Sequence, residues 1–209
     1  MMAHAMSRRR LFVVTAGAVG LGALRVEAAD LDPAPAKIQA FYDTLLACMK
    51  GAQDLGVQGR FEKLNPVVQQ TFDLATMTRI ACGPAWAKMT PDKQQAMIAA
   101  FKRMTVTSYA SQFSSYNGQQ FVVEPKATPR NADLIVRSKM MRASGDPVAF
   151  NYLMRGSGAD WKAVDVYLDG TISQLAVRRS EFSAILNSEG PDGLLAKLKT
   201  QSDGLLKGA

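Results

Sequence analysis

The segment at residues 161–186 reads WKAVDVYLDGTISQLAVRRSEFSAIL and joins a predicted strand to a predicted helix. Residues 161–168 are rich in β-branched and aromatic side chains, which favour a strand. Asp169 and Gly170 predict a turn. Ser173 is a typical N-cap residue. After it, apolar residues recur at helical spacing: Leu175, Phe182, Ile185 and Leu186. A helix that folds back over its own sheet encloses an apolar space, which is either solid core or a ligand cavity.

Three further strands are predicted before this segment. Residues 121–124, 133–142 and 148–155 show the alternation of apolar and polar side chains that strands produce. Turns rich in Gly, Ser, Asp and Pro at residues 144–147 and 156–160 connect them. We therefore expect an antiparallel meander of about four strands.

Helices are predicted on both sides of the meander. Residues 32–50 carry an apolar stripe, and a long helix that opens at Thr90 and ends at Asn117-Gly118 carries another. Between them we expect a loop at residues 51–59, a short helix at 60–64, a helix that begins at Asn65-Pro66, and a helix at 74–82 that Asp73 caps. A last helix follows residues 190–193 and docks through Leu194, Leu195 and Leu198. This order predicts an α+β fold with helices on one face of the sheet.

The first 28 residues have the features of an export signal, so residues 29–209 are expected to form the functional domain. Residues 1–10 are basic, residues 11–24 are apolar, and Val26 and Ala28 suit a cleavage site. The run SRRRLF at residues 7–12 also fits a twin-arginine signal, so the twin-arginine and general secretory routes both stay open. Removal of this segment lowers the net charge from +7 to about +4.

The residue inventory argues against catalysis and against nucleic-acid binding. The chain has one histidine, His4, which lies in the predicted signal, so Ser-His, Cys-His and His-metal chemistry is not expected. The segment at residues 161–186 contains three acidic residues, Asp165, Asp169 and Glu181. Nothing in their spacing identifies two of them as a general acid and a general base. The positive charges form no concentrated patch of the kind that nucleic acids need. We expect no enzyme, no cofactor and no metal site.

Two cysteines, Cys48 and Cys82, lie on apolar helical faces. An exported protein could join them in a disulfide. Cysteine on such a face more often serves as a small buried hydrophobic residue, so unpaired and buried thiols are favoured.

Eight methionines remain beyond residue 28, and most lie on elements expected to meet. Flexible thioethers suit a cavity for variable apolar ligands, although each single methionine is also explained by core packing. From the residues alone, a lipid carrier and an inert interaction domain stay equally open.

Several motifs together resemble the toluene-tolerance/MlaC family of periplasmic lipid-binding proteins. They occur in the family's order and cover nearly all of the chain after the signal: TFDLATMTRIACGPAW (71–86), the helix after TPDKQQ (90–95), SYASQFSSYNG (108–118), the segment from Pro147 to Leu186, and GPDGLLAKLK (190–199). The resemblance implies an NTF2-like lobe with a helical lobe, and a cavity for lipid tails between sheet and helices. It implies a monomeric periplasmic carrier that moves lipid between inner and outer membranes with inner-membrane transporter components.

Two segments look closer to the hopanoid-associated HpnM branch of that family than to its phospholipid-shuttling branch. They are GVQGRFEKLNPVVQQTFDL (56–74) and VYLDGTISQLAVRRSEF (166–182), in which the turn from Gly170 to Ser173 is one residue longer and Val177 stands where an aromatic is usual. The resemblance thus implies a hopanoid cargo. The alternatives are a phospholipid shuttle of an MlaC-type ABC transport system and a non-catalytic accessory factor in lipid modification.

The apolar residues of these elements supply the predicted cavity lining. Arg178 or Arg179 is a candidate for contact with a lipid head group, and pairing with Glu181 or Asp169 is the alternative for either arginine. The predicted lining consists of Met77, Ile98, Phe101, Tyr109, Val136, Met140, Phe150, Tyr152, Val166 and Ile172.

Overall fold

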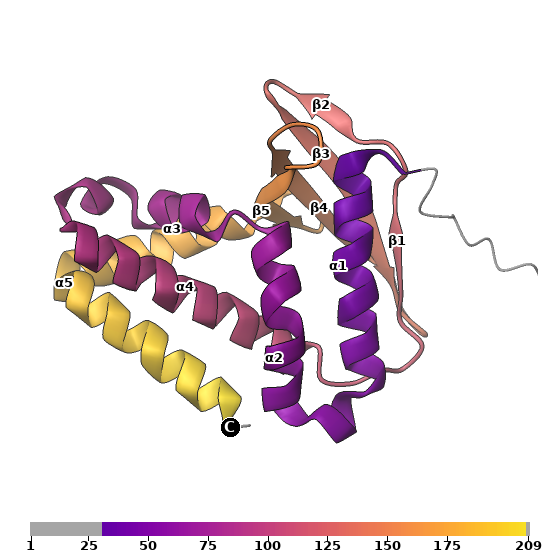
Figure 1. Ribbon diagram of the computed structural model, residues 1–209, viewed down its shortest axis with the longest axis horizontal. Helices are drawn as coiled ribbons and strands as arrows, with labels where there is room; N and C mark the ends of the chain where they lie inside the picture. Colours follow the sequence, from indigo (N-terminus) through magenta and orange to yellow (C-terminus); the bar gives the residue numbers. More distant parts are fainter. Residues whose placement is uncertain (1–30, 208–209) are drawn as a thin grey trace, which may run out of the picture.

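The computed structural model describes residues 31–207 and shows helices, then a sheet, then a final helix (Figure 1). The predicted α+β fold is confirmed. The predicted signal at residues 1–28 lies outside the described residues. The elements are α1 (Pro33–Lys50), α2 (Ala52–Thr71), α3 (Leu74–Cys82), the 3-10 helix η2 (Gly83–Lys88), α4 (Pro91–Gln112), β1 (Gln120–Val123), β2 (Thr128–Arg130), β3 (Asp133–Met141), β4 (Val148–Arg155), β5 (Lys162–Leu168), β6 (Ile172–Ser173) and α5 (Gln174–Leu206).

The sheet is antiparallel and has the strand order β1-β3-β4-β5-β6, with β2 also paired to β3. The four predicted strands correspond to β1, β3, β4 and β5. The expected number was too low because β2 and β6 have three and two residues, too few to show a period. Pro129 lies within β2, and an edge strand tolerates proline because it has an unpaired side.

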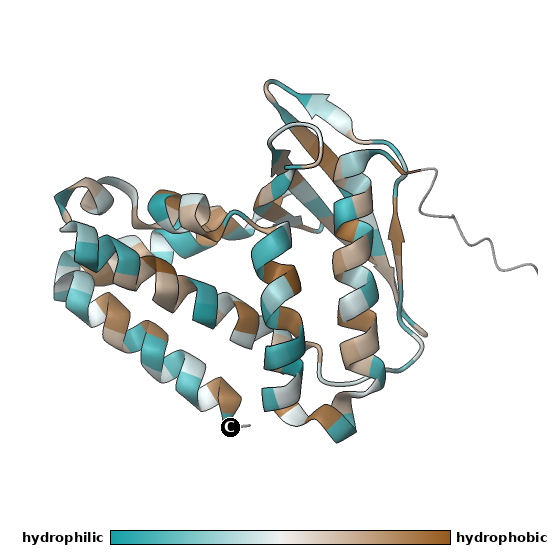
Figure 2. Ribbon diagram, in the orientation of Figure 1, coloured by the Kyte–Doolittle hydropathy of each residue, from teal (hydrophilic) through white to brown (hydrophobic). Residues whose placement is uncertain are grey.

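One face of the sheet meets the helices and the other does not. Val136, Tyr152 and Val166 are register partners across β3, β4 and β5, and the first two are almost completely buried. The next residue of β3, Arg137, is exposed, as the alternation of strand side chains requires. Figure 1 shows α1 lying along the sheet with α2 beside it, while α3, α4 and α5 form a helical layer that extends away from the strands. Figure 2 shows that these helices carry apolar and polar residues on different sides.

Helix α2 differs from the prediction in two places. The expected loop at residues 51–59 is helical, and the chain is broken only at Gly56, whose positive φ of 58° is accessible to glycine. The expected break at Asn65-Pro66 is absent, and α2 runs through both residues. Pro66 is exposed, so the carbonyl that loses its helical partner faces water and the usual cost of an internal proline is reduced.

The helix caps were predicted correctly, whereas one helix end was not. The Asp73 carboxylate accepts a hydrogen bond from the Thr76 N–H, and the Thr90 hydroxyl accepts one from the Lys93 N–H. Helix α4 ends at Gln112, before the predicted Asn117-Gly118, because Phe113 leaves helical geometry. Helix α5 reverses direction at Gly190, where φ is 68°, and its second half returns along α4 (Figure 1). The sequence predicted a docked last helix but not the element on which it docks. Leu194 and Leu198 are buried there.

Asp165 ties β5 to the start of α5. Its carboxylate, only 6% exposed, accepts hydrogen bonds from the backbone N–H of Val166 at 2.7 Å, the N–H of Leu175 at 3.0 Å and the Ser173 hydroxyl at 2.6 Å. Ser173 in turn accepts from the Ala176 N–H at 2.9 Å, which confirms it as the N-cap. A carboxylate at a helix N-terminus satisfies N–H groups that lack helical partners and interacts favourably with the helix dipole.

A second buried polar contact, which the sequence pattern did not indicate, fastens α2 to α4. Arg60 is 6% exposed, and its guanidinium donates to the Ala52 carbonyl and to the Ala110 carbonyl, both at 2.7 Å. The first carbonyl precedes the break at Gly56, and the second lies in the last turn of α4. The break at Gly56 frees the first carbonyl from its helical partner, and the end of α4 leaves the second without one, so Arg60 supplies the missing donor to both.

Replacement of Asp165 by alanine is expected to lower the free energy of unfolding by about 3 kcal/mol, because buried N–H groups lose a charged acceptor. Asp165→Asn should cost less, since the amide oxygen still accepts one of these bonds. Asp169→Asn is the matched control, because Asp169 is exposed and asparagine tolerates its positive φ. Urea unfolding followed by circular dichroism measures all three. Equal stability of Asp165→Ala and Asp169→Asn would contradict the proposed role of the carboxylate.

Both cysteine thiols are free and buried, and they are expected to resist thiol reagents in the folded protein. Burial raises the pKa of both, that of Cys82 to about 11, so little thiolate forms at neutral pH. A colourimetric thiol assay at pH 8 should detect almost no reaction until denaturant is added, and then two thiols per chain. Recovery of no thiols from the unfolded, unreduced protein would instead indicate a disulfide.

Candidate functional site

A cavity of about 400 Å³ lies between the sheet and the helices. Helices α1, α3, α4 and α5 and strands β1, β4 and β5 all contribute to its lining. The size falls in the range usual for small-molecule sites, and apolar side chains dominate, as such sites require. The lining residues are Phe41, Tyr42, Leu45, Phe72, Met77, Phe101, Met104, Thr105, Ser108, Tyr109, Gln112, Phe113, Phe121, Phe150, Tyr152, Val166, Leu168, Gln174, Leu175 and Arg178.

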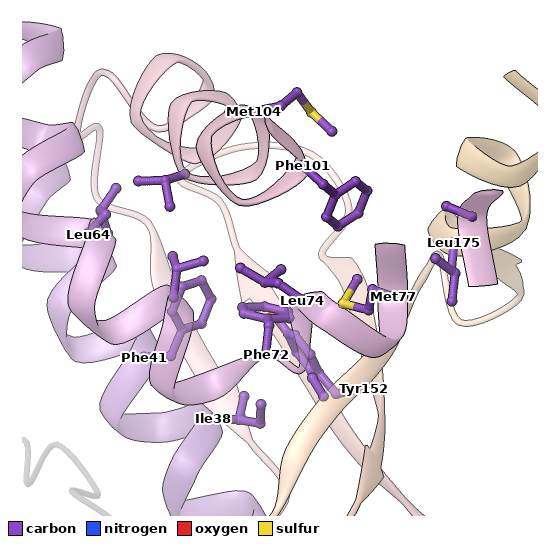
Figure 3. Close-up of a cluster of buried hydrophobic side chains, with 14 of the residues drawn as sticks. Ile38, Phe41, Leu64, Phe72, Leu74, Met77, Phe101, Met104, Tyr152 and Leu175 are labelled. Atoms are coloured by element: carbon purple, nitrogen blue, oxygen red, sulfur yellow. The ribbon is translucent and has the colours of Figure 1, made fainter. Parts of the chain in front are cut away.

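Aromatic rings that brace one another form the inner wall of this cavity. The Phe41 ring packs edge-on against Phe72 at 5.4 Å and against Tyr109 at 5.2 Å, measured between ring centroids. Phe72 is held against the sheet because the N–H of the next residue, Asp73, donates to the Ala163 carbonyl at 2.9 Å. Figure 3 shows Phe41, Phe72 and Tyr152 converging from α1, the α2–α3 junction and β4, with Met77 and Phe101 nearby.

Five polar residues line the cavity where α4 meets the start of α5. We call them the polar rim. Thr105, Ser108 and Gln112 follow one another on one face of α4, and Gln174 and Arg178 do so on α5. All five retain exposed surface, whereas Phe41, Phe72, Phe101, Met104 and Tyr152 on the inner wall are buried. The cavity is therefore apolar inside and polar where it approaches the solvent.

A chain of hydrogen-bonded hydroxyl groups lies at the inner wall. Tyr152 donates to the Tyr42 hydroxyl at 2.8 Å, Tyr42 pairs with the Ser138 hydroxyl at 2.7 Å, and Ser138 donates to the Phe150 carbonyl at 2.6 Å. Burial raises the pKa of Tyr42 to about 12, although the hydrogen bonds to Ser138 and Tyr152 lower it. Burial also raises the pKa of Tyr109 and Tyr152, so all three tyrosines stay protonated at neutral pH.

Six of the ten residues predicted as lining do face the cavity. They are Met77, Phe101, Tyr109, Phe150, Tyr152 and Val166. They come from α3, α4, β4 and β5, and the structure brings them together from positions up to 89 residues apart in the chain.

The other four predicted lining residues lie elsewhere, each for a different reason. Ile98 is about one turn before Phe101 on α4 and is half-buried, but it does not line the cavity. Val136 is fully buried in solid core. Met140 lies between its register partners Phe121 and Val148, and of these three only Phe121 reaches the cavity. Ile172, on the short edge strand β6, is 50% exposed.

Only one of the two candidate arginines lines the cavity. Arg178 does so, and its guanidinium also pairs with Glu181 at 2.8 Å. Arg179 is exposed and its side chain lies beside Gly83 instead, because successive helical residues point about 100° apart.

Several lining residues were missed although they belong to stripes seen in the sequence. Phe41, Tyr42 and Leu45 lie on the predicted stripe of α1, and Met104 and Phe113 on that of α4. Hydrophobic spacing identifies the inward face of a helix but not which inward residues border a void. The hydroxyls of Thr105 and Ser108 carried no signal at all.

The arrangement of acidic groups offers no catalytic pair. Asp165 is engaged by two backbone N–H groups and a hydroxyl, Glu181 pairs with Arg178, and Asp169 is an exposed turn residue. Between residues 31 and 207, no three His, Cys, Asp or Glu side chains gather as metal ligands would. No helix in that same range has the length and hydrophobicity needed to cross a membrane.

A sequence model of the MlaC protein family matches residues 39–200, most of the chain and all the elements that line the cavity. The chain belongs to the MlaC family. A curated relative, the toluene tolerance protein ttg2D of Pseudomonas putida, is 26% identical over 125 residues. That alignment covers 56% of this chain and 58% of the relative, so the chain matches little more than half of the relative's length.

A solved structure of a phospholipid-binding protein from Ralstonia solanacearum, in complex with a phospholipid, has the same fold as this MlaC-family chain. It superposes with a TM-score of 0.70 at 27% sequence identity. The superposition covers 82% of this chain and 98% of the Ralstonia protein.

Three tyrosines of the cavity wall, Tyr42, Tyr109 and Tyr152, are expected to make the protein less stable at alkaline pH. Above about pH 10 tyrosine ionises in the unfolded chain, while burial keeps Tyr42, Tyr109 and Tyr152 protonated when folded. The unfolded state then binds fewer protons, so the free energy of unfolding falls as pH rises, by about 1.4 kcal/mol per pH unit for each such group.

The measurement is urea unfolding between pH 9 and pH 11. Tyr109→Phe removes one of the groups that must keep its proton, so its stability should fall less steeply with pH than that of the wild type, in which Cys48 and Cys82 also contribute. Identical pH slopes for the two proteins would contradict the assignment of Tyr109 as a buried group that must keep its proton.

Proposed function

We propose that this chain is a periplasmic carrier that holds a lipid in the cavity and moves it between the inner and outer membranes. The observation that carries the proposal is the cavity itself, with its wall of braced aromatic rings and a polar rim towards solvent. An amphipathic ligand matches that polarity when its apolar body enters first. The absence of an acid–base pair at the described site favours a carrier over an enzyme.

Two comparisons support lipid as the ligand class. The Ralstonia protein is described as phospholipid-binding and was solved with a phospholipid, and it shares this fold over nearly its whole length. Membership of the MlaC family points the same way.

We infer that the lipid's apolar body contacts the cavity residues, including the six predicted from sequence. Met77, Phe101 and Val166 border the cavity from three sides. Arg178 is the candidate for the head group, because it is the one cationic side chain in the lining. Burial of apolar lipid surface contributes roughly 25 cal/mol per Å² to the free energy of binding. Burial of several hundred Å² would therefore keep the lipid bound while the carrier moves through water.

For the cargo we propose a hopanoid-type lipid. The support is the likeness of residues 56–74 and 166–182 to the HpnM branch, together with a wall of rigid rings that suits a rigid polycyclic body. A diacyl phospholipid is the alternative that the Ralstonia protein favours. A non-catalytic accessory role in lipid modification is the second alternative.

The cellular setting follows from the same proposal. Residues 1–28 would direct export by the twin-arginine or general secretory route, and residues 29–209 would form the lipid-binding domain. Inner-membrane transporter components would load or unload the carrier, which we expect to act as a monomer.

Lipid extraction from protein purified from its own host tests the proposal. Native mass spectrometry should show a bound species, and chromatography of the extract should identify a hopanoid. Phospholipid alone would replace the proposed cargo with the alternative. Absence of any lipid, with no uptake of hopanoid or phospholipid in vitro, would overturn the carrier function.

A blocked cavity should abolish lipid uptake without unfolding the protein. Ser108→Trp places an indole ring in the cavity from the polar rim, so we expect at least a tenfold loss of lipid uptake from vesicles. Ala99→Trp, on the exposed side of the same helix, is the matched control and should leave uptake unchanged. Equal uptake by both variants, with circular dichroism confirming the fold, would place the lipid outside this cavity.

A further inference from the structure

The two segments that carry the polar rim have almost no charge. Residues 104–123, which run from the cavity-lining part of α4 into β1, contain no Asp, Glu, Lys or Arg, and neither do residues 170–177 at the start of α5. Such gaps are unusual in a chain in which 21% of residues are charged. Of the charged side chains at residues 31–207, only that of Arg178 lines the cavity, and Glu181 balances its charge at 2.8 Å.

Two aliphatic side chains lie exposed just outside the polar rim. Ile172 is 50% exposed, and its carbonyl accepts a hydrogen bond at 3.2 Å from the side-chain amide of Gln174, which belongs to the rim. Val177 is 42% exposed and lies one turn after Gln174 on α5, so the two residues are neighbours on the helix surface. Apolar surface therefore faces water where β6 and α5 border the cavity.

A lipid bilayer fits this surface better than a protein does. A stable protein interface buries roughly 800 Å² on each partner, and its charged and polar groups select the partner. Two half-exposed aliphatic side chains among uncharged neighbours provide little of either. A bilayer requires only the shallow insertion of apolar side chains, with a strength that scales with the apolar area buried. It is also the place from which a lipid must come and to which it must return.

We propose that the protein docks directly on the lipid bilayer through Ile172 and Val177, with the polar rim facing the membrane, when it loads and releases its ligand. The contact is apolar and does not depend on anionic lipids. Two side chains give weak and reversible binding, which suits a carrier that has to leave the membrane again. The inference rests on the proposed carrier function and adds the surface through which the lipid is exchanged.

The kinetics of lipid transfer test the proposal without any variant. The protein is loaded with NBD-labelled phosphatidylcholine or NBD-labelled cholesterol, whichever it binds, and mixed with phosphatidylcholine vesicles that contain a rhodamine-labelled quencher. Docking predicts that the transfer rate rises in proportion to the vesicle concentration. A rate that is independent of vesicle concentration would show that the lipid leaves through water, and it would overturn the proposal.

Val177→Asp should lower the rate of transfer to vesicles at least about fivefold, because it places a carboxylate where the apolar contact forms. The fold should persist, since the first turn of a helix favours an acidic residue. Val122→Asp is the matched control. Val122 is 51% exposed, but it lies on the other face of the sheet, because its neighbour Phe121 lines the cavity. Both variants should bind the labelled lipid as tightly as the wild type, and equal transfer rates for the two would reject the docking surface.

Salt distinguishes this surface from a contact driven by charge. Arg137 and Lys139 are exposed on the uncovered face of the sheet and offer positive charge to an anionic membrane. Raising the salt concentration about tenfold shortens the Debye length about threefold and weakens such a contact. Transfer to phosphatidylcholine vesicles should stay unchanged. A rate that collapses in salt, or that requires phosphatidylglycerol in the vesicles, would place the docking surface on these positive charges instead.

The two proposals fail in different ways. If the wild type binds a labelled lipid but its transfer rate depends neither on vesicle concentration nor on residue 177, the carrier function stands and the docking surface is wrong. If the wild type binds neither labelled lipid and carries no lipid from its own host, both proposals are wrong.

Discussion

The buried carboxylate of Asp165 is the contact on which the cavity depends. It lies on β5, and through Ser173 and the Leu175 N–H it fixes where α5 begins and in which direction it leaves the sheet. Leu175 and Arg178, in the first turns of that helix, are part of the cavity lining. A carboxylate can remain charged in this position because two N–H groups and a hydroxyl replace the water it loses, and a helix N-terminus favours negative charge.

The cavity stays open because its walls cannot collapse into it. Protein interiors usually fill such space, since unfilled volume forfeits dispersion contacts and lowers stability. Here the inner wall consists of rings that hold one another edge-on, and of tyrosines whose hydroxyls are tied into a chain that ends on the sheet backbone. Arg60 adds a constraint on the far side by joining the end of α4 to the broken start of α2. The space is therefore built into the fold.

Much of the fold was predictable from the period of the apolar residues. The strand at residues 148–155 has the predicted bounds, and Asp73, Thr90 and Ser173 cap helices as their residue types indicate. The errors fall where local preference and tertiary context disagree. Pro66 signals a helix break, yet α2 continues because that side faces solvent, and β6 exists only because β5 offers it an edge.

The order of the main helices and strands and the inward face of each could be read from the sequence, as could the lack of histidine between residues 31 and 207. These are local properties, set by spacing along the chain and by the chemistry of single side chains. Which inward residues border empty space depends on how the elements pack together. Val136 and Tyr152 are register partners in the sheet, yet of these two residues only Tyr152 lines the cavity. A void is a property of how several elements meet, and no pattern within one element encodes it.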